Sequence, residues 1–244
     1  PLGLIGIGLG TVLLPTISRQ LGGGEEAAAL ETQNRGLELA LLLTLPATVA
    51  LVVAGEPIAA ALFGYGRFTP EDTHFTAQAL AAFSIGLPSY ILVKVLTPGF
   101  YARQDTRTPV RYATISMVVN LVGNLALILP LQHMGPPLAT AIASTVNTAM
   151  LYRTLVARGH FAADARLRRR APRLLLAALA MGVALWFGQD LLTPYVHGTW
   201  PVRFAALAAL VSAGMVVYGL ATVVMGAFSK DDIALLLRRR RATS

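Results

Sequence analysis

Seven long stretches with few or no charged side chains dominate this sequence. They cover residues 2–17, 36–54, 76–100, 112–131, 135–152, 174–189 and 204–229. Hydrocarbon about 30 Å thick needs roughly 20 apolar residues for one helical crossing, and a helix satisfies all its own backbone hydrogen bonds in lipid. The chain is 55% hydrophobic and 13% charged, and its mean hydropathy is +0.62. We therefore predict an all-α, polytopic transmembrane helix bundle of seven spans.

The basic residues predict the orientation of these spans, because the side richer in lysine and arginine is cytoplasmic. Seventeen of the 20 lie in the connections after the first, third, fifth and seventh spans, whereas the alternate connections hold only Arg67 and Arg203. A further apolar stretch, residues 57–65, is too short to cross and is predicted to lie at the interface or re-enter. The C-terminus is thus expected in the cytoplasm and Pro1 outside.

The net charge of +8 favours contact with anionic membrane lipids over nucleic acid. The arginine runs at 168–170 and 238–241 adjoin predicted spans, where such runs set orientation and bind anionic headgroups. Nucleic-acid binding would instead need basic residues with aromatics on a folded soluble surface. An enzyme is not expected, because the chain has no cysteine, no HExxH, no P-loop and no Gly-x-Ser-x-Gly. Its four histidines are scattered and predict no metal site.

Polar side chains form one face on each of the fourth and fifth spans. A turn over residues 132–137 is too short to separate the two helices, so the faces can meet across an antiparallel hairpin. We favour interhelical hydrogen bonds as their role. The alternative is a cation site with monovalent cation coupling and no other cofactor, although neither face carries a carboxylate. The faces consist of Ser116, Asn120 and Asn124, and of Thr140, Ser144 and Asn147.

Lys94 is a charge well inside a predicted span, where a lysine costs about 2.5–3.5 kcal/mol at the helix centre. It precedes Arg103 by nine residues, or about 13 Å at the helical rise. Its side chain can therefore either contact a substrate or extend to the interface. Arg19, Arg103 and Arg107, in the connections predicted to be cytoplasmic, are the further candidates for substrate contact.

The stretch from Lys94 to Pro109 reads KVLTPGFYARQDTRTP and resembles the signature of the MurJ/MviN lipid II flippase family. Residues 8–18, GLGTVLLPTIS, and residues 62–68, LFGYGRF, support the resemblance, which extends in order along essentially the whole chain. The resemblance implies a flippase of the multidrug/oligosaccharidyl-lipid/polysaccharide superfamily. Such a protein would move undecaprenyl-diphosphate-linked peptidoglycan precursor from the inner to the outer leaflet by alternating access, in the bacterial inner membrane.

The resemblance also implies a domain plan of two six-helix lobes followed by two additional helices, which would form a groove for the undecaprenyl tail. Residues 1–157 would be most of the second lobe, 158–173 a basic cytoplasmic connection, 174–228 the additional pair and 229–244 a basic tail. Residues 2–17 are slightly short for a span, so we expect further sequence upstream of Pro1. The resemblance implies that this N-terminal half carries most of the central-cavity arginines that bind the diphosphate of lipid II. A drug or oligosaccharide-lipid exporter and a non-transporting membrane scaffold are the alternatives.

The charge distribution predicts a labelling pattern for single cysteines. Gly159→Cys should react only with a thiol reagent added from the cytoplasmic side, and Gly198→Cys only with one added from outside, because each lies in a connection assigned to that side. Labelling of Gly159→Cys by an impermeant external reagent would contradict the topology.

Overall fold

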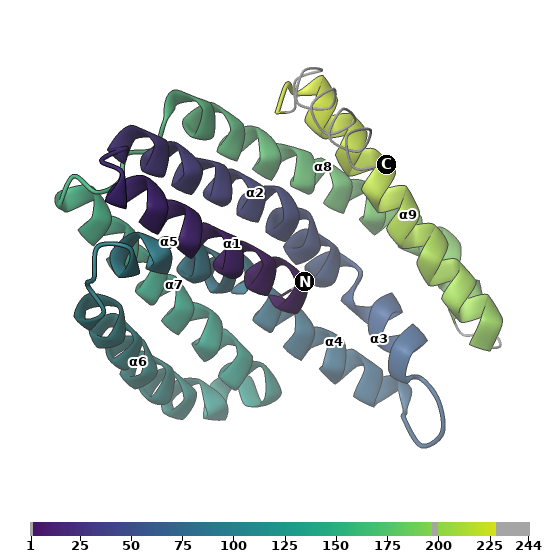
Figure 1. Ribbon diagram of the computed structural model, residues 1–244. Coiled ribbons are helices and arrows are strands. Elements are labelled where there is room, and N and C mark those ends of the chain that lie inside the picture. The colour runs from purple at the N-terminus through teal and green to yellow at the C-terminus, as the bar shows by residue number, and fades with distance from the viewer. Residues whose placement is uncertain (1, 197–199, 228–244) are drawn as a thin grey trace.

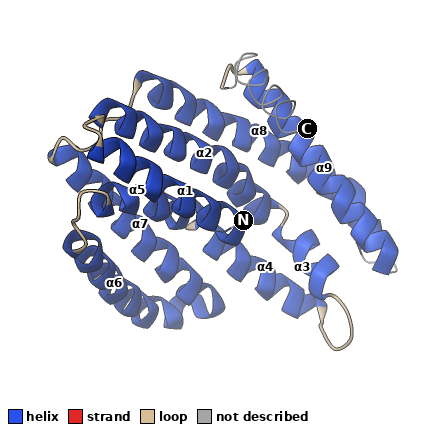
Figure 2. Cartoon of the chain, in the orientation of Figure 1, coloured by secondary structure: helices blue, strands red, loops and turns tan. Residues whose placement is uncertain are grey.

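The computed structural model describes the backbone of residues 2–196 and 200–227, and the side chains of residues 10–189 and 201–227. Within these residues the regular structure is all helical, with short loops between the helices and no strand (Figure 2). The predicted tail at 229–244 and the labelling position Gly198 lie outside the described residues. The elements are α1 (Leu2–Gly22), α2 (Glu26–Val53), α3 (Gly55–Phe63), α4 (Pro70–Ser84), α5 (Leu87–Tyr101), α6 (Arg107–Leu131), the 3-10 turn η1 (Gln132–Met134), α7 (Gly135–Ala157), α8 (Ala165–Val196) and α9 (Trp200–Val224).

Five stretches of the described chain are long and apolar enough to cross a membrane. One of them, Arg107–Ala157, contains the two antiparallel helices of the α6–α7 hairpin, so these stretches hold six of the seven predicted spans. Helix α1, with 21 residues, is the remaining one. The all-helical, multi-pass fold is therefore confirmed, and the count of seven agrees approximately.

Several helix ends differ from the predicted ends. Helix α2 begins ten residues before the predicted span at Gly36, and α8 begins at Ala165 rather than Leu174. Hydropathy locates only the part of a helix that lies in hydrocarbon, whereas a helix continues into the polar zone wherever its side chains find partners. The basic connection predicted at 158–173 is consequently helical from Ala165 onward.

Prolines interrupt the helices less than their number suggests. Pro15, Pro46, Pro98 and Pro130 all lie inside continuous helices. Pro88 lies in the first turn of α5, just after the break at Ile85–Gly86 that divides the third predicted span into α4 and α5. Each internal proline still removes one backbone donor and frees the carbonyl four residues before it.

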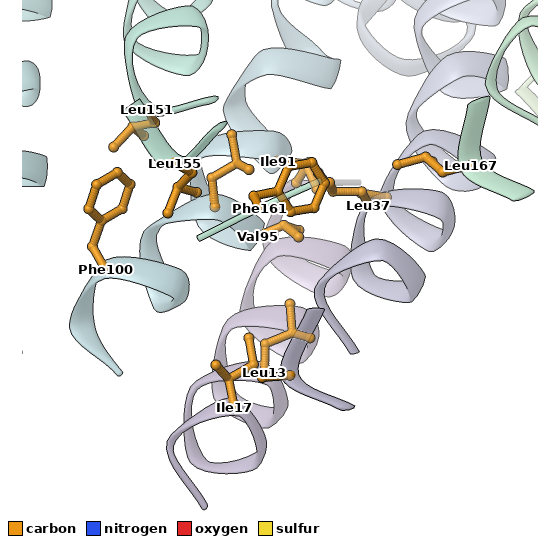
Figure 3. Close-up of a cluster of buried hydrophobic side chains, with 13 residues drawn as sticks. Leu13, Ile17, Leu37, Ile91, Val95, Phe100, Leu151, Leu155, Phe161 and Leu167 are labelled. Atoms are coloured by element: carbon orange, nitrogen blue, oxygen red, sulfur yellow. The ribbon is translucent and has the colours of Figure 1, made fainter. Parts of the chain in front are cut away.

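Two packed clusters organise the bundle. The larger is built around Ile17, Ile91, Val95 and Leu155, and it joins α1, α2, α5 and α7 (Figure 3). The smaller consists of Ala54, Met181, Leu185 and Leu210 and joins the end of α2 to α8 and α9. Helices α8 and α9 therefore lie along the α2 side of the bundle, while α6 lies at the opposite edge against α7 (Figure 1).

Helices α2 and α8 approach each other closely. A Cβ atom added to Gly182 of α8 would lie 2.5 Å from Cγ1 of Val49 on α2. In lipid, such close approach through small residues is a main source of helix association, because hydrocarbon tails are as apolar as the side chains themselves. The glycine therefore keeps α8 tight against α2.

Candidate functional site

The four basic residues predicted to contact substrate lie on α1, on α5, in the turn after α5 and at the start of α6. Lys94 is exposed on α5, and its ammonium has no ion pair or hydrogen bond among the described residues. Arg19 near the end of α1 and Arg107 at the start of α6 are exposed as well. The structure thus places Arg19, Arg103 and Arg107 near one end of the bundle, with Lys94 deeper, on the helix α5 that ends just before Arg103.

Arg103 is more enclosed than the other three. Its guanidinium donates to the backbone carbonyl of Gly99 at 2.9 Å. Partial burial lowers its pKa, and the opposite charge of Glu26, at the start of α2, acts in the other direction. This electrostatic contact shows that the start of α2 and the end of α5 lie at the same end of the bundle.

Asp105 lies in the turn that connects Arg103 to the start of α6 at Arg107. Its carboxylate accepts from the Thr108 backbone N–H at 3.0 Å and from the Thr108 hydroxyl at 2.6 Å, and it pairs with Arg158 at 2.6 Å. These bonds lower the pKa of Asp105 to about 2, with the Thr108 hydroxyl contributing most. The aspartate within the KVLTPGFYARQDTRTP stretch therefore caps α6 and ties it to the end of α7.

The polar faces of α6 and α7 meet, as the short turn predicts. Ser116 donates to the carbonyl of Ala143 at 2.7 Å, Asn120 donates to Thr140 at 3.0 Å, and Asn124 donates to Asn120 at 3.0 Å. Ser144 is half-buried, without a hydrogen bond among the described residues. The first two contacts join α6 to α7, and the third continues this polar ladder along α6.

Two acceptors of this ladder remain open. The side-chain oxygens of Asn124 and Asn147 are buried and have no hydrogen-bond partner within the described part of the chain. Buried polar atoms are usually paired, so these oxygens are available to a further donor, a water or a cation. No carboxylate lies beside them on either face, and the cation site stays a prediction.

A groove runs between α2 and α9, and α8 forms its floor. Its volume is about 620 Å³, and its lining is almost entirely apolar. Leu42 and Pro46 come from α2, Met181 and Leu185 from α8, and Tyr218 from α9. An extended hydrocarbon chain suits such a lining, because no polar group would have to lose its water to receive it.

A buried carboxylate escaped the sequence analysis. Glu38 of α2 is only 8% exposed and forms ion pairs with Arg35, Arg166 and Arg170. Arg35 also pairs with Asp164, which accepts from the Leu167 backbone N–H at 2.6 Å and so caps the start of α8. We call these five charged residues the Glu38 network.

Asn34 reinforces the Glu38 network from the next turn of α2. Its amide donates to the carbonyl of Ala162 at 3.0 Å and accepts from the Asp164 backbone N–H at 3.1 Å.

The sequence contained a partial signal for the Glu38 network. Glu38 follows Arg35 by three residues, and Arg166 precedes Arg170 by four, so each pair shares one helical face. Only the packing of α8 on α2 brings the two faces together.

Comparison with known proteins gives one consistent result. The family model described as lipid II flippase MurJ matches residues 1–206. Over 100% of the chain, 41% of residues are identical to a probable lipid II flippase MurJ of Rhizobium meliloti (strain 1021), and over 95% of the chain 35% are identical to one of Vibrio cholerae. The chain spans 46% and 44% of these two relatives, or about half their length.

A solved structure agrees with the sequence comparisons. The structure of a lipid II flippase MurJ in an inward closed conformation superposes with a TM-score of 0.73 and 25% identity. The match covers 92% of this chain and 44% of the other. The resemblance inferred from the residues is therefore confirmed, and the chain corresponds to one part of a longer fold.

The Glu38 network predicts a specific loss of stability. In the full-length protein, Glu38→Gln should lower the free energy of unfolding by roughly 3 kcal/mol, near the low end for breaking a buried ion pair, because several of the arginines keep partial access to water. Glu31→Gln, an exposed position on the same helix, is the matched control and should change it by less than about 0.5 kcal/mol. Equal losses in denaturant unfolding would contradict the role of Glu38.

Proposed function

The chain belongs to the lipid II flippase MurJ family, and we propose that it forms the C-terminal portion of a flippase that moves lipid II from the inner to the outer leaflet. The protein would act as a transporter, with no bond made or broken. The single observation that carries this proposal, beyond family membership, is the apolar groove of about 620 Å³ between α2, α8 and α9. A polyprenyl tail attached to a polar headgroup requires such a surface.

The headgroup imposes the opposite requirement. A diphosphate cannot cross hydrocarbon unaided, so the transporter must supply a hydrated cavity with positive charge. Lys94 meets this need within the described chain, because its ammonium is exposed on α5 and lacks an internal partner among the described residues. Arg19, Arg103 and Arg107 would attract the diphosphate at the end of the bundle from which it enters, and further contacts would come from the other half of the protein.

The remaining assignments follow from the same proposal. The protein would be a multi-pass protein of the bacterial inner membrane with a cytoplasmic C-terminus, and its arginine-rich connections would contact anionic lipids. Residues 1–157 would belong to the second lobe and 174–228 to the added helix pair. The open oxygens of Asn124 and Asn147 would accept a monovalent cation if transport is coupled to one, with any charged ligand supplied from outside this chain.

Transport can be tested directly in cells. Full-length protein produced in bacteria depleted of their own lipid II flippase should restore growth and prevent accumulation of lipid II in the inner leaflet. Restored growth with lipid II still trapped inside would indicate another activity. Failure to rescue, despite normal amounts of folded protein in the membrane, would contradict the proposal.

Lys94 gives a residue-level prediction. In the full-length protein, Lys94→Ala should reduce lipid II translocation roughly tenfold or more, the scale expected when a hydrogen bond to a charged group is lost. Membrane insertion should be unaffected, because the substitution removes a charge that is costly to insert. Lys94→Arg should retain intermediate activity, since the charge is kept but its geometry differs. Translocation by Lys94→Ala at the wild-type rate would mean that Lys94 only extends to the interface.

A further inference from the structure

Pro46 creates an unsatisfied carbonyl on the wall of the groove. The residue lies inside α2, and proline has no backbone N–H to donate to the carbonyl four residues earlier. That carbonyl belongs to Leu42. Both Leu42 and Pro46 line the groove, so water cannot satisfy the carbonyl once hydrocarbon fills the space. In lipid, a backbone group freed in this way must find a partner within the protein.

Tyr218 of α9 supplies that partner. Its hydroxyl donates to the carbonyl oxygen of Leu42 at 2.9 Å, although the two residues are 176 positions apart. Tyr218 also lines the groove and packs against the cluster of Met181, Leu185 and Leu210. Its ring therefore lies at the groove wall with its polar end on the opposite helix.

Two further polar contacts of α9 with other helices lie near its two ends. Near the start of the helix, Arg203 donates to the carbonyls of Ala60 and Gly64, at the end of α3. Just after the helix ends, Arg173 of α8 donates to the carbonyl of Gly226 at 2.9 Å. Between these ends α9 packs on α8, the groove floor. The Tyr218 hydrogen bond thus joins α9 to α2 across the groove, in the C-terminal half of α9 and between the two end contacts.

We infer that Tyr218 is a positioning residue. Its bond to the carbonyl freed by Pro46 holds α9 at a fixed distance from α2, and this distance sets the width of the groove. The inference rests on the proposed function only where the groove is said to receive the lipid tail. Its structural part, that the Pro46–Tyr218 pair sets the spacing of two helices, stands independently.

The spacing can be measured by electron paramagnetic resonance between spin labels on cysteines introduced at Leu39 of α2 and Leu220 of α9. Both positions are exposed, each lies two or three residues from the hydrogen-bonded pair, and the chain has no cysteine of its own. In the full-length protein, with any cysteines outside this chain replaced, Tyr218→Phe should broaden the distance distribution and shift it to longer values.

The dependence on Pro46 distinguishes this pairing from an ordinary loss of contact. Pro46→Ala restores an N–H that satisfies the Leu42 carbonyl within α2, so adding Tyr218→Phe in that background should broaden the distribution much less. The coupling between Pro46 and Tyr218 is measured by comparing the effect of Tyr218→Phe on the distance distribution in the wild-type and Pro46→Ala backgrounds. Equal broadening in both backgrounds, or none from Tyr218→Phe alone, would overturn the inference.

Tyr112→Phe provides the matched control. The Tyr112 hydroxyl forms a hydrogen bond to that of Thr154 at 2.7 Å and joins α6 to α7 away from the groove, so its removal should leave the α2–α9 distance unchanged. A change as large as that from Tyr218→Phe would overturn the inference. The measurement requires no lipid II, so failure of the pairing and failure of the proposed transport can be told apart.

Discussion

The need to satisfy backbone hydrogen bonds without water governs this structure. Inside hydrocarbon an unpaired carbonyl costs several kcal/mol, so the described chain is built from helices joined by short loops. At two places a side chain from another helix satisfies a carbonyl that its own helix leaves open. Tyr218 meets the carbonyl that Pro46 frees in α2, and Arg203 meets the carbonyls at the end of the short helix α3. Both donors come from α9. A helix with few charges of its own is thereby attached to the rest of the bundle by polar bonds.

Buried charged side chains likewise need partners within the protein. The buried carboxylate of Glu38 is surrounded by arginines from α2 and α8, at the end of the bundle where basic connections accumulate. Removing one charged residue from the Glu38 network would leave an uncompensated buried charge. Separating α2 from α8 at this point is therefore costly. Lys94 differs because its ammonium has no such partner among the described residues. The contrast separates a charge that fastens two helices from one that remains available to a ligand.

Local patterns made part of this architecture predictable. Hydropathy identified the spans, and the four-residue spacing of Ser116, Asn120 and Asn124, next to a short turn, predicted that two polar faces would meet. The Glu38 network could not be obtained in the same way, because Glu38 and Arg170 are 132 residues apart and only tertiary packing joins them. The start of α8 was misplaced for the same reason. Polar residues stay helical there because α2 supplies their partners.

One face of α2 contacts both α8 and α9. Glu38, Leu42 and Pro46 follow one another at intervals of four residues and so lie along a single stripe of the helix. The stripe begins with an ion network that holds the start of α8 and continues with a freed carbonyl that holds α9. Since α2 makes each contact in the series, it is bonded to both α8 and α9. A movement of α2 would therefore change the shape of the groove that it forms with α8 and α9.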